Sequence, residues 1–273
     1  MLRAADITFA YSSHASPVLR GVSFEVPARG FVGILGPNGS GKTTLLRLLA
    51  GTRQPSGGHV TLDGVELSRL ARAALARRMA VVPQETHLAF DFTALEVVLM
   101  GRYPHLSAFE IEGPRDLAMA RAALAATGTA ALEDRLFATL SGGEKQRVVI
   151  AAALAQISPG SDRDAGILLL DEPTAALDLA YQLEVAALLR DLQQRTPIAI
   201  VVSTHDLNFA AGLCRTLVLL KDGRVLAAGP TDEVLTKANI RALYGVEAEI
   251  QSHGGAGHLV VVPIRRVPPE ARG

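Results

Sequence analysis

Short apolar runs separated by glycine and proline fill the first 65 residues of the chain. Runs of this length, bounded by turn residues, are typical of β-strands. They lie at residues 6–10, 22–26, 31–35 and 59–62. One helix is expected among them, over residues 42–50, because Gly51 follows at the position where a left-handed glycine ends a helix.

The pattern becomes helical and rich in alanine from about residue 93 to residue 155. Leu117, Ala120 and Leu124 recur at the spacing of one helix face, and Leu132 and Leu136 are expected to share another. We therefore predict a helical insert at about residues 87–158.

Strand character returns at residues 167–170 and 198–203, with a helix between them. That helix is marked by the spacing of Val185, Leu188, Leu189 and Leu192. Strands that alternate with helices predict a parallel sheet. Asp222-Gly223 between two apolar runs predicts a hairpin. The tail after Pro263 is rich in arginine and proline, and we expect it to lack regular structure.

Composition narrows the class of protein. Lys+Arg and Asp+Glu are equal at 27 each among 273 residues, which argues against a chain built to coat nucleic acid. The mean hydropathy of +0.26 fits a buried sheet or a large partner interface. We expect no membrane span, no signal peptide and a cytoplasmic location. Cys214 is the single cysteine, which excludes an intramolecular disulfide.

A glycine-rich loop follows the run at residues 31–35 and precedes the first helix. It matches the phosphate-loop pattern, in which backbone N–H groups surround phosphates, a lysine bridges the β- and γ-phosphates and a hydroxyl ligates Mg²⁺. The predicted nucleotide-binding residues are Gly36, Pro37, Asn38, Gly39, Ser40, Gly41, Lys42, Thr43 and Thr44. By itself the loop indicates only a nucleoside triphosphate, since kinases, GTPases and helicases share it.

Two acids end the apolar run at residues 167–170. Side chains of adjacent strand residues point to opposite sides, so Asp171 and Glu172 serve different purposes. We predict that Asp171 holds Mg²⁺ and that Glu172 is the general base that polarises the attacking water. The alternative is a strand that merely ends in acidic residues.

Leu140-Ser141-Gly142-Gly143-Glu144 opens another helix with a serine and two glycines, which is a second candidate anion site. The alternative is that Ser141 only caps the helix. The stretch resembles the signature motif of ATP-binding-cassette (ABC) ATPases, with Glu144 where glutamine is commonest. The chain is therefore similar to the ATP-hydrolysing subunits of ABC transporters over about residues 2–245.

Four further residues match this family in order along the chain. The resemblance implies that Tyr11 stacks on adenine, that Gln84 touches Mg²⁺ and faces the membrane partner, that Asp178 belongs to the D-loop, and that His205 is the switch histidine at the γ-phosphate. Taken singly, Tyr11 could be a core residue, Gln84 a surface residue and His205 a histidine satisfied at a strand end. In this set Lys42, Gln84, Glu172 and His205 are the expected catalytic residues.

The resemblance implies an α/β P-loop NTPase (RecA-like) core with an inserted helical subdomain and an N-terminal antiparallel β-subdomain. The expected domain covers residues 1–245, with its core at 1–86 and 159–245, its helical subdomain at about 87–158, and an extension at 246–273. The resemblance also implies ATP and Mg²⁺, and a dimer in which the Lys42 loop of one chain and the Ser141 turn of the other enclose each ATP.

The stretch after Gln84, and above all Gly101-Arg102-Tyr103-Pro104-His105, looks like the ATPases of bacterial importers for iron-siderophores, haem and cobalamin. This implies an integral-membrane permease as partner, a substrate-binding protein as indirect partner, and a place on the cytoplasmic face of the inner membrane. The long link at residues 158–166 is similar to that of some haem importers. Alternatives are another ABC importer or exporter, or a soluble ABC ATPase such as an iron–sulfur assembly factor.

Overall fold

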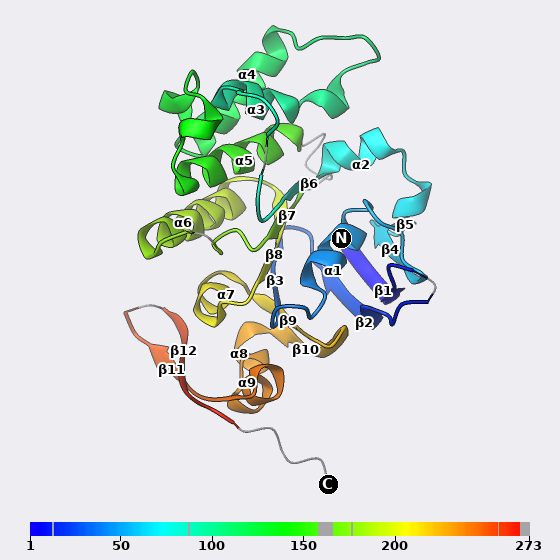
Figure 1. Cartoon of the computed structure of the whole chain (residues 1–273), viewed down its shortest axis with the longest axis vertical. Coiled ribbons are helices and arrows are strands. Elements are labelled where there is room, and N and C mark those ends of the chain that lie inside the picture. Colours follow the sequence, from blue (N-terminus) through cyan, green and yellow to red (C-terminus); the bar gives the residue numbers. More distant parts are fainter. Residues whose placement is uncertain (13, 87, 158–165, 176, 256, 268–273) are drawn as a thin grey trace. The chain divides into compact units, whose positions relative to one another are not determined.

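The computed structural model describes residues 1–12, 14–86, 88–157, 166–175, 177–255 and 257–267 (Figure 1). It divides into two compact units, one of residues 1–68 and 201–273 and the other of residues 69–200.

An antiparallel sheet opens the first unit, with the strand order β2-β1-β4-β5. Its strands are β1 (Leu2–Phe9), β2 (Leu19–Val26), β4 (Gly57–Leu62) and β5 (Val65–Glu66). The buried residues of β1 skip from Ala4 to Ile7 rather than keeping strict alternation. The pairing register with β2 shifts at that point, and Asp6 adopts a positive φ of 52°. This bulge keeps both ends of β1 facing the core.

The first unit also contains the strand that leads into the phosphate loop. All five residues of β3 (Phe31–Leu35) are buried, and β3 runs parallel to β9 (Thr216–Lys221). The predicted helix follows as α1 (Lys42–Leu49). The predicted hairpin joins β9 to β10 (Arg224–Pro230), and both Asp222 and Gly223 have positive φ values, 49° and 74°. These predictions are confirmed.

The remaining elements of this unit follow β8 (Ile198–Thr204), whose last four residues belong to it. They are α7 (Leu207–Leu213), α8 (Thr231–Val234), α9 (Lys237–Tyr244), β11 (Val246–His253) and β12 (His258–Arg266). The prediction of an irregular tail directly after Pro263 is wrong, because β12 continues to Arg266, which pairs with Val246. The ion pair between Arg265 and Glu247 at 2.8 Å shows why arginines there suit a strand.

The second unit supplies the other parallel strands. β6 (Met79–Val82) runs parallel to β7 (Gly166–Asp171), with Val82 opposite Leu170. Every residue of β7 is buried, as expected of a parallel strand covered on both faces. The short η1 (Leu67–Arg69) and α2 (Arg72–Arg78) precede β6, and the long α6 (Leu179–Arg195) leads from β7 to β8. Val185, Leu189 and Leu192 are buried on the predicted face of α6, and Leu188, the fourth residue predicted for that face, is half-buried.

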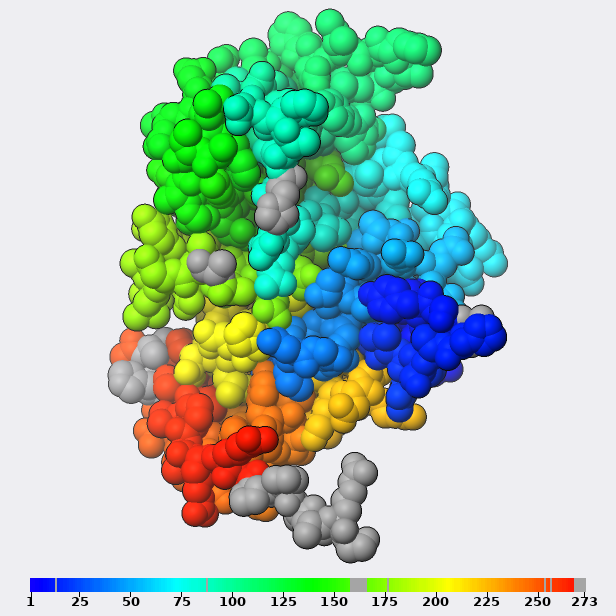
Figure 2. Space-filling model, viewed as in Figure 1, coloured from blue at the N-terminus to red at the C-terminus, as the bar shows by residue number. Residues whose placement is uncertain are grey.

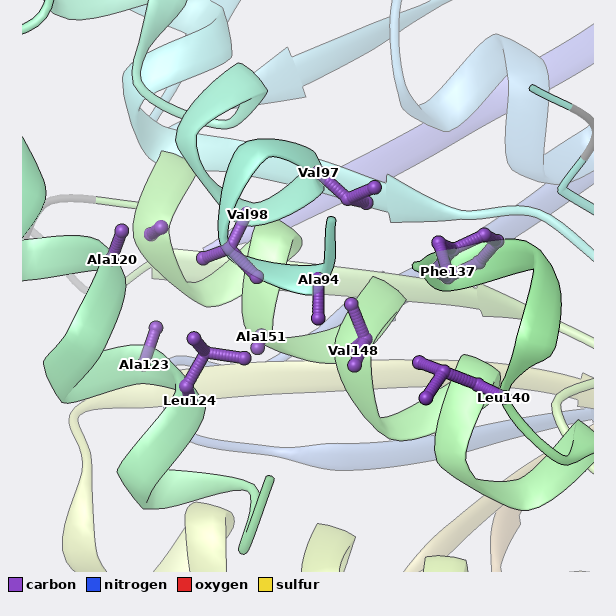
Figure 3. Packing of buried hydrophobic residues seen from close by; sticks show 11 residues of the cluster. Ala94, Val97, Val98, Ala120, Ala123, Leu124, Phe137, Leu140, Val148 and Ala151 are labelled. Carbon is purple, nitrogen blue, oxygen red and sulfur yellow. The ribbon is translucent and has the colours of Figure 1, made fainter. Parts of the chain in front are cut away.

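Three helices of the second unit pack on one another: α3 (Ala94–Met100), α4 (Pro114–Ala126) and α5 (Gly142–Gln156). Short 3-10 turns lie between them at η2 (Tyr103–His105), η3 (Ala130–Leu132) and η4 (Phe137–Thr139). Figure 3 shows Val98 of α3 and Leu124 of α4 meeting in their common core, both fully buried. The small Ala120, Ala123 and Ala151 let the helices approach closely.

The expected helical face of Leu132 and Leu136 is wrong, because Leu132 ends η3 while Leu136 lies outside any helix and is 42% exposed. Otherwise the predicted architecture is confirmed: parallel α/β strands, an inserted helical layer and an N-terminal antiparallel sheet. The expected domain limits stay a prediction, and residues 158–165 of the long link lie outside the described residues. Within the described part of the chain, no helix is both long and apolar enough to cross a membrane.

Candidate functional site

The predicted phosphate loop joins β3 to α1 in the first unit. Gly41, the N-cap residue, has a φ of 105° and no side chain with which to cap the helix, and the first turn contains no acidic residue. The first N–H groups of a helix have no partner within the helix, and its N-terminus carries a partial positive charge. The loop therefore offers an uncapped helix start, which is the feature that binds phosphate.

Gly36 has to be glycine for a steric reason. A Cβ atom at this position would lie 2.3 Å from the carbonyl oxygen of Leu220 and 2.7 Å from Oγ of Ser40. The N–H of Gly36 donates to the carbonyl of Thr204 at 3.4 Å, which ties the start of the loop to the end of β8. The loop is thus held against two strand ends of its own unit.

Lys42 lies inside this loop and is only 5% exposed. Its Nζ donates to the carbonyl oxygens of Gly36 at 2.9 Å and Pro37 at 3.3 Å. The hydroxyl of Ser40 is buried and has no hydrogen-bond partner among the residues that the structure describes. A buried ammonium group and an unsatisfied hydroxyl in one loop suit an oxygen-rich anion.

Tyr11 stands next to the phosphate-loop helix. Its hydroxyl and Oγ1 of Thr44 are 2.9 Å apart, and its ring meets the edge of Phe9 with centroids 5.1 Å apart. The tyrosine is nevertheless 55% exposed. A ring that is anchored at two points and still exposed can stack on a flat base.

His205 also belongs to the first unit, directly after β8. It is exposed, and Asp206 after it caps α7 by accepting from the N–H groups of Asn208 at 2.8 Å and Phe209 at 3.0 Å. None of the sequence motifs assigns a role to Asp206. An aspartate just before an apolar run is a readable N-cap signal that could have identified it.

The two acids lie at the end of β7 in the second unit. Asp171 is 6% exposed, whereas Glu172 is half-buried and has a positive φ of 46°. That left-handed conformation turns the chain out of the strand directly after Asp171. The Glu172 carbonyl accepts from the N–H of Ala175 at 3.1 Å, which closes the turn.

Gln84 follows β6 by two residues and is exposed. Strands β6 and β7 are parallel and Val82 lies opposite Leu170, so Gln84 and Asp171 both lie at the carboxyl ends of this strand pair. Carboxylate and amide oxygens are the ligands that hard cations such as Mg²⁺ prefer. Among the described residues, no group of three or more His, Cys, Asp or Glu side chains could hold a metal ion by itself.

The candidate signature turn begins α5. The hydroxyl of Ser141 accepts from the N–H of Glu144 at 3.3 Å, and the Glu144 carboxylate accepts from the N–H of Ser141 at 2.8 Å. This is a capping box. Hydrogen bonds from Ser141 lower the pKa of Glu144, with smaller contributions from the nearby arginines. Glu144 thus serves the helix as well as completing the motif.

The signature turn and the D-loop residue lie in the same region of the second unit. A Cβ atom on Gly143 would stand 2.4 Å from the ring of Tyr181, so α5 and α6 make close contact there. Asp178 caps α6 by accepting from the N–H of Tyr181 at 3.2 Å. Ser141 and Asp178 are both exposed.

The segment Gly101–His105 proves to be largely a packing element. A Cβ atom on Gly101 would lie 2.2 Å from the carbonyl oxygen of Ala152, so glycine is needed for α3 to approach α5. Arg102 is 4% exposed and donates to Asp116 at 3.0 Å and to the Ala155 carbonyl at 2.7 Å.

His105 contacts the carbonyl oxygen of Gln156 at 2.8 Å, and burial, aided by nearby guanidinium groups, lowers the pKa of His105. Within this segment Tyr103 is exposed, and so are the apolar side chains of Phe90, Phe109 and Ile111 on either side of it in the sequence.

Comparison with known proteins agrees with this arrangement. The family model described as "ABC transporter" matches residues 19–175. A hemin import ATP-binding protein of Gloeobacter violaceus is 43% identical over 97% of this chain and 94% of that protein. A cobalamin import ATP-binding protein of Halobacterium salinarum is 42% identical over 85% of this chain, which spans 56% of that longer protein.

Solved structures agree as well. An inward-facing transporter described as of the metal-chelate ABC type has a TM-score of 0.82 at 30% identity, with 97% of both chains covered. The dimeric bacterial ABC transporter cassette MJ0796 has a TM-score of 0.71 at 29% identity, over 85% of this chain and 99% of that one.

Proposed function

Because this chain belongs to the ABC transporter family and is one of its ATP-hydrolysing subunits, we propose that it drives uptake of a metal chelate: haem, an iron-siderophore or cobalamin. The observation that carries this proposal is the match with a hemin import protein along 97% of the chain. Identity of 43% over that length includes the helical layer, which is where a membrane partner would be recognised.

The first unit contains the groups that bind the nucleotide. Tyr11 stacks on the adenine, the loop from Gly36 to Thr44 surrounds the phosphates, and Lys42 binds the β- and γ-phosphates. Lys42 already donates to two loop carbonyls, and phosphate oxygens replace these acceptors when ATP enters. His205 contacts the γ-phosphate.

The second unit contributes the acidic groups. Asp171 and Gln84 of this unit, together with Thr43 of the first unit, are the residues that would hold Mg²⁺, and the ion would supply positive charge at the phosphates. Glu172 accepts a proton from the attacking water. The different exposure of the two carboxylates, 6% for Asp171 and half-buried for Glu172, supports this division of labour.

The working form is a head-to-tail dimer. Each chain carries one phosphate loop and one signature turn, and one ATP binds between the Lys42 loop of one chain and the Ser141-Gly142-Gly143 turn of the other. The dimeric cassette among the similar structures supports this. So does the start of α6, where Leu179 is 71% exposed and Leu183 is 64% exposed beside Asp178.

The partner on the membrane side is an integral permease, which in turn receives its cargo from a substrate-binding protein. The exposed Phe90, Tyr103, Phe109 and Ile111 form the apolar surface that the permease covers. Gln84 links that contact to the Mg²⁺ ligands. Such a partner implies a position at the cytoplasmic face of the inner membrane.

The cargo can be identified in proteoliposomes that contain the permease encoded beside this gene, the full chain and the neighbouring binding protein. We expect ATP-dependent uptake of haem, and none when the chain carries Glu172→Gln. Uptake of cobalamin or an iron-siderophore instead would change the cargo within the proposed class. ATP-dependent efflux, or no permease that binds this chain, would contradict the importer.

A further inference from the structure

The C-terminal part of the chain contacts the backbone at the candidate switch histidine. The hydroxyl of Tyr244, the last residue of α9, donates to the carbonyl oxygen of His205 at 3.2 Å, across 39 positions of sequence. Both residues belong to the first unit. His205 is exposed, whereas Tyr244 is half-buried.

Two short-range contacts also hold the turn that carries His205. The N–H of Asp206 donates to Oγ1 of Thr204 at 3.0 Å, and the Asp206 carboxylate caps α7. These bonds fix the residues on each side of His205. The bond from Tyr244 adds a long-range anchor at the histidine itself.

The helix that follows His205 is held by the C-terminal hairpin. The side-chain amide of Asn208 makes two hydrogen bonds with Val261 of β12: it accepts from the Val261 N–H at 2.8 Å and donates to the Val261 carbonyl at 3.1 Å. The imidazole of His258 packs over Gly212, where a Cβ atom would come within 3.1 Å of Nε2. Figure 2 shows the red hairpin lying against the yellow α7.

We propose that Tyr244 is a positioning residue for hydrolysis, and that it and the Asn208–Val261 contact hold His205 in the orientation that meets the γ-phosphate. This inference rests on the proposed role of His205. A hydrogen bond that fixes a backbone carbonyl limits the rotation of that residue, and small displacements of a catalytic side chain reduce rate more than binding. Tyr244 and the β11–β12 hairpin therefore form a brace for His205.

Tyr244→Phe in the full chain removes only the hydroxyl. We expect kcat for ATP to fall about 3- to 10-fold, the effect of one lost hydrogen bond, with the KM for ATP unchanged and the melting temperature lowered by no more than a few degrees. Ser68→Ala is the matched control, because it likewise removes one side-chain hydroxyl hydrogen bond, from Ser68 to the Glu66 carboxylate at 3.3 Å, and it should leave all three quantities unchanged.

A double-mutant cycle with His205→Ala separates this inference from the proposed function. We expect His205→Ala to reduce turnover strongly and Tyr244→Phe to add nothing in that background. Normal turnover in His205→Ala would overturn the proposed role of the histidine. A loss from Tyr244→Phe that is equal in both backgrounds, or no loss in either, would overturn the brace alone.

Asn208→Ala tests the second contact. It should reduce kcat with an unchanged KM, as Tyr244→Phe does, whereas Arg265→Gln, which breaks only the exposed ion pair within the hairpin, should not. If Asn208→Ala and Arg265→Gln have the same effect on kcat, the hairpin does not act through α7 and the proposal fails.

Discussion

At the scale of single residues, local backbone features position the candidate side chains. The bulge at Asp6 turns β1, the positive φ of Glu172 ends β7, and the uncapped Gly41 opens α1 to an anion. Tyr11 illustrates how such devices combine, because its hydroxyl meets Thr44 and its ring edge meets Phe9 while more than half of it stays exposed.

Tyr11→Ala should weaken ATP binding by about 1–3 kcal/mol, the range measured for stacking one base on an aromatic ring. Tyr11→Phe retains the ring and loses only the contact with Thr44, so its affinity should stay close to that of the wild type. Isothermal titration with ATP measures both. Equal weakening by the two variants would show that the hydroxyl matters and that the ring does not stack on adenine.

At the scale of elements, the helical layer depends on a buried ion pair. The side chains of Arg102 and Asp116 are 5% and 13% exposed, and Arg102 also reaches the carbonyl of Ala155 on α5. The pair thus ties the turn after α3 to α4 and α5. Arg121 and Glu133 form a comparable pair at the surface, where the arginine is 53% exposed.

Arg102→Met should lower the free energy of unfolding by about 3–5 kcal/mol, because it leaves a carboxylate without its partner. Arg121→Met, the surface control, should cost about 1 kcal/mol or less. Urea denaturation measures both free energies of unfolding. Equal losses would show that burial does not make the Arg102–Asp116 pair more important for stability than the surface pair.

The same pair should make stability depend on pH. The hydrogen bond from Arg102 lowers the pKa of Asp116 below its ordinary 3.8, so the pair stabilises the fold above that pH. The difference between the wild type and Arg102→Met should therefore narrow as the pH falls through the lowered pKa.

The sequence predicts these elements unevenly. Contiguous motifs identify Lys42, Asp171 and Ser141, because strand, loop and helix follow one another at fixed spacing. The bonds from Arg102 to Ala155 and from Asn208 to Val261 each span 53 positions, so no local sequence pattern predicts them. The strand at residues 264–266 was missed for the same reason, since it depends on pairing with β11.

At the scale of the whole molecule, the proposed dimer requires two separate candidate sites on each chain, the phosphate loop and the signature turn. The phosphate loop and His205 belong to one unit, and the signature turn, Asp171 and Glu172 belong to the other. In the proposed dimer, ATP joins unlike surfaces of two copies, so its γ-phosphate favours the closed form and hydrolysis releases it. ATP binding and hydrolysis would thereby close and open the dimer, and this change of conformation is what a membrane partner can use.

The ATP-dependent dimer and the role of Glu172 are tested most directly by light scattering. The mass of the full chain with Glu172→Gln is measured with and without Mg²⁺ and ATP. We predict a monomer without nucleotide, a stable dimer with ATP, and almost no turnover. Adding Lys42→Ala to the same chain should abolish the dimer. Undiminished hydrolysis by Glu172→Gln would show that Glu172 is not the general base. A monomer at saturating ATP would show that ATP does not join two copies of the chain.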